Sequence, residues 1–334
     1  MDIQQVARRA RVSTATVSRV LTGSANVRES TSARVRKAIA DLNYVPNTSA
    51  RSLRVGRSRL LGLIVSDINN PFFPELIDAF EGLAARQGIE VIFTHTNYDL
   101  DRLRSSVRRM VERNVDGIAV MTSEMQEDAL TQIPRGIPVI LMNQPSLQDR
   151  YANVPVEYGN SFHEAVEYLR SLHHRDIGFI AGPPELSSAK RRRRDWELAM
   201  KDLKLRVRPE WIVTGDMRVE SGEVSMKSLL ALRRRPTAVL ATNDLMGVGA
   251  LQAAHHAGVR VPKELSLIGF DDLPVSSMMV PPLTSIRIPR REIASHAFDY
   301  LLRAIRGEKP LPCPPVYPKL VIRKSTGAAL RTSP

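Results

Sequence analysis

The stretch IQQVARRARVSTATVSRVL, residues 3–21, decides the fold of the first part of the chain. Its apolar residues have helical spacing in two short segments, residues 3–9 and 14–21, which a turn at residues 11–13 separates. Ser13 is a good N-cap, because its hydroxyl can accept a hydrogen bond from a backbone N–H two or three residues on. Two short helices joined by such a turn form a helix-turn-helix.

A third helix is expected over residues 30–42, where apolar residues recur at i, i+3, i+4 and i+7. Arg11 lies in the turn where glycine is usual, and a positive φ there would cost Arg roughly 1 kcal/mol relative to glycine. The stretch NTSARSLRV at residues 47–55 is basic and too short for a stable isolated helix. We expect it to be a linker, or a hinge that folds on a partner.

The positive charge of the chain is concentrated in this region. The 334 residues carry a net charge of +13, of which residues 1–59 contribute +9, from twelve basic and three acidic side chains. The other 275 residues contribute only +4. A basic module joined to a nearly neutral body indicates polyanion binding. The alternative is a solvated basic surface, which the helical periodicity of the segment does not favour.

The composition excludes several classes of protein. A hydrophobic fraction of 43% supports sizeable cores. The single cysteine, Cys313, rules out an intramolecular disulfide and indicates a reducing compartment. No apolar stretch approaches the ~20 residues that span a bilayer, and the first residues lack the apolar segment of a secretory signal. We therefore expect a cytoplasmic protein without a membrane partner.

From residue 60 onward, short apolar runs alternate with helical stretches. Strands are expected at residues 60–66, 90–94, 117–121, 138–142, 177–181, 238–242, 265–270, 284–288 and 320–323. Helices are expected at residues 74–87, 101–113, 126–133, 161–172, 188–203, 220–232, 245–257 and 290–306. Such alternation is typical of βαβ units, and it predicts two similar α/β lobes with parallel sheets.

The chain lacks the sequence signatures of common enzymes. It contains no GxxxxGK[ST], HExxH, GxSxG or CxxC motif. The adjacent pairs His173-His174 and His255-His256 would point in different directions on a helix, so they make poor metal sites. We expect neither an enzyme nor a bound cofactor or metal.

Several motifs, in this order, resemble the lactose-repressor (LacI/GalR) family of bacterial transcription regulators. After residues 3–21 they are LNYVPNTSARSL, NPFF, GPPELSSAKRRRRDW, ATNDLMGVGAL, LSLIGFDD and PPLTSI. The resemblance covers about residues 3–323. It implies an all-α helix-turn-helix headpiece and an α/β, two-lobed body with doubly wound parallel sheets, similar to periplasmic binding proteins.

The resemblance also implies domain boundaries. The headpiece would be residues 1–46 and the hinge helix or linker residues 47–58. The N-terminal lobe would combine residues 59–156 with 289–318. The C-terminal lobe would combine residues 157–288 with 319–334.

The second helix is similar to the family's recognition helix, which presents its first residues to base edges in the major groove. Thr14, Ala15 and Arg19 are the candidate base readers, since Arg can bond to guanine in a bidentate manner. Thr16 and Tyr44 are better suited to phosphate.

Leu53 resembles the family's hinge leucine, an apolar wedge that kinks DNA from the minor groove. Arg51 and Arg54 would then lie near the DNA backbone or the minor groove.

The resemblance implies an effector pocket beyond the carboxyl ends of the strands. The matching residues are Phe72, Phe73, Arg192, Met217, Asn243 and Asp271. One of the two phenylalanines is expected to stack on the ligand and the other to pack in the core. Only one or two of the five basic residues 190–194 can face a cleft. Asp244 either belongs to the site or caps the following helix.

The chain departs from the family at one place. Many members have an Asp-Asn pair where the chain enters the second lobe, whereas this sequence has VEYGN at residues 156–160. The acidic side chain that this Asp-Asn pair would contribute to the effector pocket is either absent here or replaced by Glu157. A phosphorylated or acidic sugar would explain the basic run at residues 190–194, but the ligand stays open.

We therefore expect a repressor that binds a palindromic operator in double-stranded DNA as a homodimer. A small sugar or sugar derivative between the lobes would control it. The alternative is a co-repressor-dependent or activating regulator of the same family that docks a partner protein.

Overall fold

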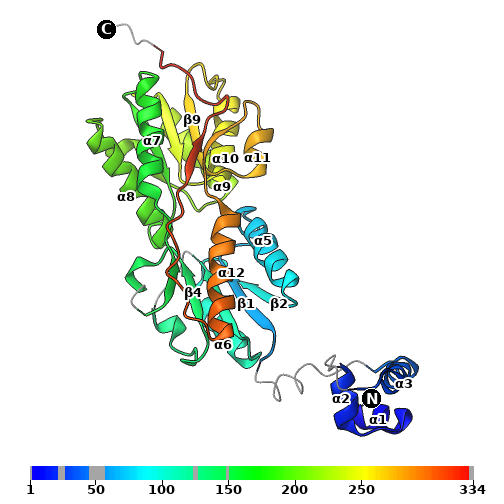
Figure 1. Ribbon diagram of the computed structural model, residues 1–334. Helices are drawn as coiled ribbons and strands as arrows, with labels where there is room; N and C mark the ends of the chain where they lie inside the picture. Colours follow the sequence, from blue (N-terminus) through cyan, green and yellow to red (C-terminus); the bar gives the residue numbers. More distant parts are fainter. Residues whose placement is uncertain (1, 22–26, 45–56, 123–126, 148–149, 331–334) are drawn as a thin grey trace. The chain divides into compact units, whose positions relative to one another are not determined.

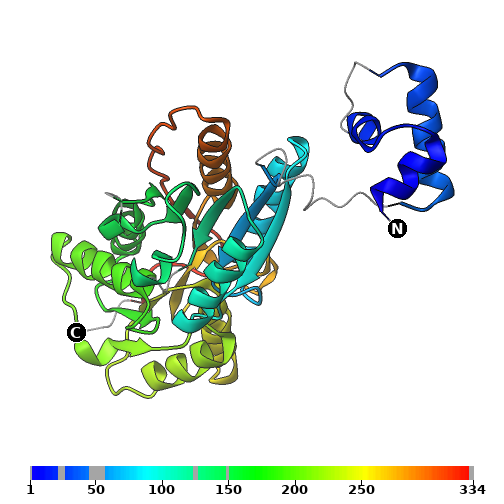
Figure 2. The ribbon, with the colours of Figure 1, turned by 90° about the horizontal axis from the view of Figure 1, so that it is seen from below.

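The computed structural model describes residues 2–21, 27–44, 57–122, 127–147 and 150–330. The chain divides into two compact units, Met1–Ser58 and Arg59–Pro334. Figures 1 and 2 show the helices of the first unit in blue and the α/β architecture of the second in the remaining colours. No helix within the described ranges is long and apolar enough to cross a membrane.

The first unit is a three-helix headpiece made of α1 (Ile3–Ala10), α2 (Thr14–Leu21) and α3 (Glu29–Asp41). Each helix contributes its predicted apolar face to one small core, centred on Val6, Val17 and Val35. These three side chains are fully buried, so the periodicity seen in the sequence is confirmed.

Local interactions define the ends of the first two helices. Asp2 and Gln5 form a reciprocal capping box at the start of α1. Arg11 ends α1 in the left-handed region, with φ 53°, which is the strained turn conformation considered from the sequence. The Ser13 hydroxyl accepts from the Thr16 backbone N–H at 3.2 Å, which confirms Ser13 as the cap of α2.

The first sheet of the body has the strand order β2-β1-β3-β4-β5, and all its neighbours are parallel. Its strands are β1 (Leu60–Val65), β2 (Glu90–His95), β3 (Gly117–Met121), β4 (Val139–Met142) and β5 (Ala152–Val154). Helices α5 (Phe72–Arg86) and α12 (Arg290–Arg306) share a core with one face, and α6 (Leu100–Glu112) packs on the other. Leu63 and Ile64 point into these two different cores, which is why the strands are apolar throughout.

The second sheet has the order β11-β10-β9-β8-β6-β7. Its strands are β6 (Ile177–Ala181), β7 (Ile212–Thr214), β8 (Ala238–Ala241), β9 (Ser266–Asp271), β10 (Thr284–Arg287) and β11 (Lys319–Val321). Only the β10–β11 pair is antiparallel.

Helices cover both faces of the second sheet as well. On one face lie α7 (Tyr158–Ser171) and α8 (Ser187–Asp202), and on the other α9 (Val219–Leu230) and α10 (Asp244–His256). The prediction of two α/β lobes with parallel sheets is therefore confirmed.

The chain passes between the two sheets three times: after β5, before α12 and before β11. The first and last passages run side by side through a parallel bridge between Val156 and Val316. Figure 1 shows the orange α12 on the sheet that contains β1 and β4, and the red C-terminal segment returning to the other sheet, where β11 pairs with β10.

The structure corrects some of the predicted elements. The helix expected over residues 126–133 is wrong, because the described part holds only a 3-10 turn, Glu127–Leu130. Pro134 follows within four residues and leaves no room for a longer helix. The short strands β5 and β7 and the five-residue helix α11 (Pro274–Met278) were missed, because such brief segments give no clear periodicity.

Candidate functional site

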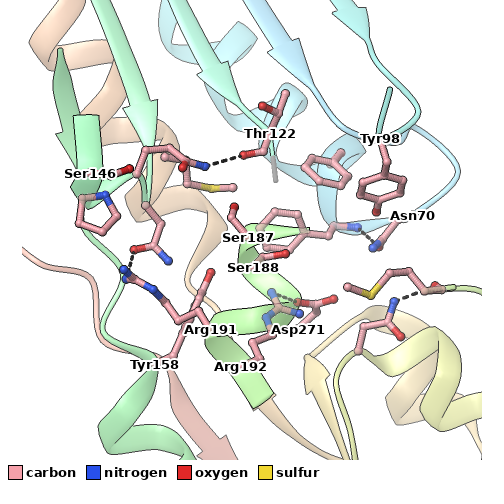
Figure 3. A pocket seen from close by; sticks show the side chains of 18 residues that line it. Asn70, Tyr98, Thr122, Ser146, Tyr158, Ser187, Ser188, Arg191, Arg192 and Asp271 are labelled. Carbon is pink, nitrogen blue, oxygen red and sulfur yellow. Dashed lines mark hydrogen bonds and ion pairs between the residues drawn. The ribbon is translucent and has the colours of Figure 1, made fainter. Parts of the chain in front are cut away.

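A cavity of about 290 Å³ opens at the carboxyl ends of the strands of both sheets (Figure 3). All the effector-site residues selected from the sequence line it: Phe72, Phe73, Arg192, Met217, Asn243 and Asp271. They come from segments that follow β1, β6, β7, β8 and the end of β9. Because parallel strands direct their carboxyl ends to one edge, residues far apart in the sequence meet here.

We call the lobe built on strands β1–β5 the first lobe and the lobe built on β6–β11 the second. Two aromatic residues form part of the cavity wall in the first lobe. Phe72 and Phe73 begin α5, and their rings meet edge to face at 5.0 Å. The Asn70 side chain accepts from the Phe72 N–H at 3.0 Å and fixes the start of the helix. Both rings line the cavity, and both are almost completely buried. Each phenylalanine is therefore part of the cavity wall as well as of the hydrophobic core.

The second-lobe floor carries a buried ion pair between Arg192 and Asp271. Arg192 Nη2 lies 3.3 Å from Asp271 Oδ1, and Arg192 Nη1 donates to the Thr242 carbonyl at 2.7 Å. The guanidinium also lies 4.1 Å from the centre of the Phe270 ring. These contacts hold both charged groups in one orientation, at the edge of the cavity.

The pair differs from exposed groups in its proton affinity. Burial raises the pKa of Asp271 to about 6, although Arg192 and Arg290 lower it. Burial lowers the pKa of Arg192, but Asp271 and Tyr158 outweigh it, so the net shift is upward. Asp271 therefore presents a carboxylate at neutral pH, with few water molecules to compete for it.

Arg290 connects this ion pair to the first lobe. Its Nη1 donates to the Asp271 carbonyl, and its Nε donates to the Glu75 carboxylate in α5 at 2.8 Å. The side chain is 7% exposed, and it lies 5.8 Å from the centre of the Phe72 ring. One buried residue therefore links the backbone of Asp271 to α5.

Asn243 shapes the cavity by positioning other residues. Its Nδ2 donates to the Met217 carbonyl at 2.8 Å, and its Oδ1 accepts from the Met246 N–H at 2.9 Å. The first bond holds Met217, whose φ is 74°, against the cavity. The second makes Asn243 the N-cap of α10, so the suggestion that Asp244 caps this helix is wrong.

Asp244 instead lies in the core beside the site and is fully buried. It accepts hydrogen bonds from the Leu273 N–H and from the hydroxyls of Ser276 and Ser285, at 2.6–2.7 Å. Burial and the charge of Asp271 raise its pKa to about 7. It joins the start of α10 to the segment that follows Asp271.

The cavity also has residues that the sequence reasoning missed. Tyr158 begins α7 and lines the cavity, whereas Glu157 is exposed and does not. The pocket acid sought at this junction is therefore absent, and an aromatic residue replaces it. Arg191 and two serines of α8, Ser187 and Ser188, complete this side. The basic run at residues 190–194 indicated positive charge near the cavity, but the sequence did not show which of these side chains face inward.

The candidate DNA-contacting residues that the structure describes lie on the headpiece. Thr14, Ala15 and Arg19 are exposed on α2, while Thr16 is partly covered and its hydroxyl lies 3.0 Å from that of Ser13. Tyr44 is half-buried and packs against the headpiece core. The candidate hinge residues Arg51, Leu53 and Arg54 lie outside the described residues.

Known proteins resemble both parts of the chain. Residues 2–47 match the family of bacterial regulatory proteins, lacI family, and residues 166–326 match a periplasmic binding protein-like domain. The chain is 35% identical over 329 residues to the HTH-type transcriptional repressor PurR of Proteus mirabilis, covering 97% of this chain and 96% of that protein.

Solved structures show the same fold. The lac repressor dimer bound to operator and the anti-inducer ONPF has a TM-score of 0.86 at 28% identity, covering 98% of this chain and 99% of that one. A complex of the transcriptional regulator CelR with cellobiose has a TM-score of 0.73 at 26% identity, covering 97% and 99%.

Proposed function

This chain belongs to the lacI family of bacterial regulatory proteins and is a DNA-binding transcriptional repressor with an effector-binding body; we propose that a sugar or sugar derivative is the effector. One observation carries this proposal. The residues selected from the sequence converge on one cavity, whose floor is the Arg192–Asp271 pair. The protein is not an enzyme, since its relatives are transcriptional repressors.

The chemistry of the cavity supports a polyhydroxylated ligand. At about 290 Å³ it is near the lower limit of ~300 Å³ for small-molecule pockets, which suits a compact ligand. Asp271 offers carboxylate oxygens that accept from hydroxyls, and Arg192 donates beside it. Phe72 and Tyr158 provide apolar faces on which a sugar ring can rest. The similar CelR structure contains cellobiose, which is consistent with this class of ligand.

On the DNA side, we propose that a homodimer reads a palindromic operator in the cytoplasm. Thr14, Ala15 and Arg19 would face base edges, because all three are exposed on α2, the first two at its start and Arg19 in its last turn. Thr16 and Tyr44 would contact phosphates, and Leu53, between Arg51 and Arg54, would act as the minor-groove wedge. The lac repressor structure, a dimer bound to operator, supports this arrangement.

The proposed mechanism requires that the effector bind the two cleft conformations with different affinity. We propose lobes of residues 59–156 with 289–318 and of residues 157–288 with 319–334, after a headpiece of residues 1–46 and a hinge of residues 47–58. Closing the cleft would shift the first lobes of the two subunits relative to each other. This shift would change whether the hinge of each subunit folds on DNA. Arg290, which connects Asp271 to α5, is a direct route for this change.

The test is to measure operator binding while candidate effectors are titrated. The operator is first selected from random duplex DNA with the full-length protein, and a palindromic consensus is expected. The Asp271→Ala variant should keep its operator affinity but lose the response to the effector. The proposal fails if no ligand changes operator affinity at saturation, or if the variant still responds with unchanged midpoint. A fall or a rise in affinity identifies the effector as an inducer or as a co-repressor.

A further inference from the structure

The five basic side chains at residues 190–194 of α8 do not all point to the same side of the helix. Of residues 190–194, only Arg191 and Arg192 line the cavity. Arg193 is exposed and pairs with Glu197 at 2.9 Å, so its charge belongs to the outer surface of the helix. Two adjacent arginines therefore enter a cavity whose sole carboxylate, among the lining residues that the structure describes, is Asp271.

These two arginines have different partners. Arg192 is paired with Asp271. Arg191 donates to the neutral side chain of Asn143 at 2.9 Å, and within the described ranges no carboxylate lies within 4.0 Å of it. Asp195, one turn further along α8, forms no ion pair with Arg191; burial raises the pKa of Asp195, and the charges of Arg191 and Arg194 oppose that rise. The cavity therefore has an excess positive charge at Arg191.

The start of α8 adds to this positive region. The helix has 16 residues and begins at Ser187, and its N-cap, Leu186, has no side chain that can accept from the first N–H groups. The partial positive charge of a helix N-terminus favours an anion. Ser187 and Ser188 line the cavity at this end, and Figure 3 shows them with Arg191 and Arg192 on the same end of the helix.

We propose that the effector carries an anionic group, a phosphate or a carboxylate, which binds among Arg191, Ser187 and Ser188 while Asp271 and Arg192 hold its hydroxyls. This proposal rests on the proposed effector function and narrows its ligand. An Arg guanidinium binds both kinds of anion through parallel N–H bonds, and serine hydroxyls supply further donors.

The position of the anion also explains how it could act on the protein. Arg191 belongs to α8 in the second lobe, and Asn143 follows β4 in the first lobe. Their hydrogen bond already crosses the cavity. An anion beside Arg191 is within the same cluster as Asn143 and Ser146, so it would bind the closed cleft better than an open one.

The experiment uses matched ligands and the full-length protein. Several hexoses and pentoses are each tested as the neutral sugar, the sugar acid and the sugar phosphate, by thermal shift and then by calorimetry. Inorganic phosphate alone is the control for an unspecific effect of anions. We expect one anionic sugar of the panel to bind at least about 10-fold more tightly than its neutral parent. Whether the phosphate or the acid binds more tightly then shows which anionic group the site prefers.

Variants then locate the anion. Arg191→Gln should weaken the anionic ligand by about 10- to 100-fold, as expected for the loss of a charged hydrogen bond, and weaken the neutral parent much less. Arg193→Gln removes the same charge from the same helix outside the cavity, so it should have little effect. Asn143→Asp places a carboxylate against Arg191 and should also weaken the anionic ligand selectively.

The outcomes separate this inference from the proposed function. A neutral sugar that binds as well as its charged forms, with no effect of Arg191→Gln, overturns the anionic site and leaves the sugar effector intact. Equal losses in Arg191→Gln and Arg193→Gln also overturn it, since they indicate a general charge effect. If no member of the panel binds, both the sugar effector and the anionic site are wrong.

Discussion

The buried Asp244 predicts an unusual dependence of stability on pH. Its carboxylate is fully buried, with the charge of Asp271 nearby, and its pKa is raised from 3.8 to about 7. The change to test is Asp244→Asn, which has nearly the same shape and no charge. In the folded protein the amide resembles the protonated acid, because its Nδ2 can donate to Ser285 where the carboxylate Oδ1 accepts.

The sign and size of the effect follow from the two pKa values. Below about pH 4 the carboxyl is protonated in both the folded and the unfolded chain. Between about pH 4 and 7 the unfolded chain has released the proton and the folded chain still binds it, so stability falls as the pH rises. One pKa unit corresponds to about 1.4 kcal/mol, so a shift of about three units amounts to about 4 kcal/mol.

Chemical unfolding at a series of pH values measures this difference. Urea unfolding of the wild type and of Asp244→Asn from pH 4.5 to 7.5 should show the variant gaining about 1.4 kcal/mol relative to the wild type per pH unit, with the gain levelling off as the pH reaches about 7. Asp78→Asn, at an exposed position of α5, controls for the change in net charge. The reasoning is refuted if the difference between Asp244→Asn and the wild type does not change with pH, or changes in the opposite direction.

Three further changes test the packing and the DNA contacts. Gly249→Ala in α10 would place a Cβ atom against the backbone of Val219 and 2.7 Å from the N atom of Glu223, so we expect a loss of about 3 kcal/mol in urea unfolding. Gly159→Ala in α7, where the added Cβ atom would meet nothing within 4 Å outside the adjacent helix backbone, is its control and should not destabilise. Arg19→Ala should cost about 1–3 kcal/mol of operator binding and relax the preference at one base pair, and an equal loss on all sequences would contradict base reading. Leu53→Ala should weaken operator binding more than random-DNA binding, and equal losses in a gel-shift titration would exclude the wedge.

Much of the fold was predictable because its signals are local. The headpiece helices follow from apolar spacing around Val6, Val17 and Val35, all of which are buried as expected. The long apolar strands and amphipathic helices of the body were also found, with ends that differ by a few residues. Elements such as β7 and α11 were missed, because three to five residues provide too little pattern to distinguish a strand or turn from a loop.

The candidate site was predictable in its members but not in their interactions. The six effector-site residues were selected by resemblance, and all of them line the cavity. Their separate roles were not visible. Asn243 and Asp244 are neighbours in the sequence, yet one caps α10 and holds Met217, and the other lies buried among Leu273, Ser276 and Ser285. Such roles depend on which distant segment each side chain meets.

The sequence by itself determined the family, the basic headpiece and the two α/β lobes, because helix periodicity, strand composition and charge are properties of neighbouring residues. Only the tertiary structure decided which arginines of residues 190–194 enter the cavity, and that Tyr158 rather than Glu157 faces it. The direction of a side chain depends on the register of its helix against the sheet beneath it. That register is set by contacts such as Trp196 of α8 on Phe179 of β6, which form only when the helix packs on the sheet.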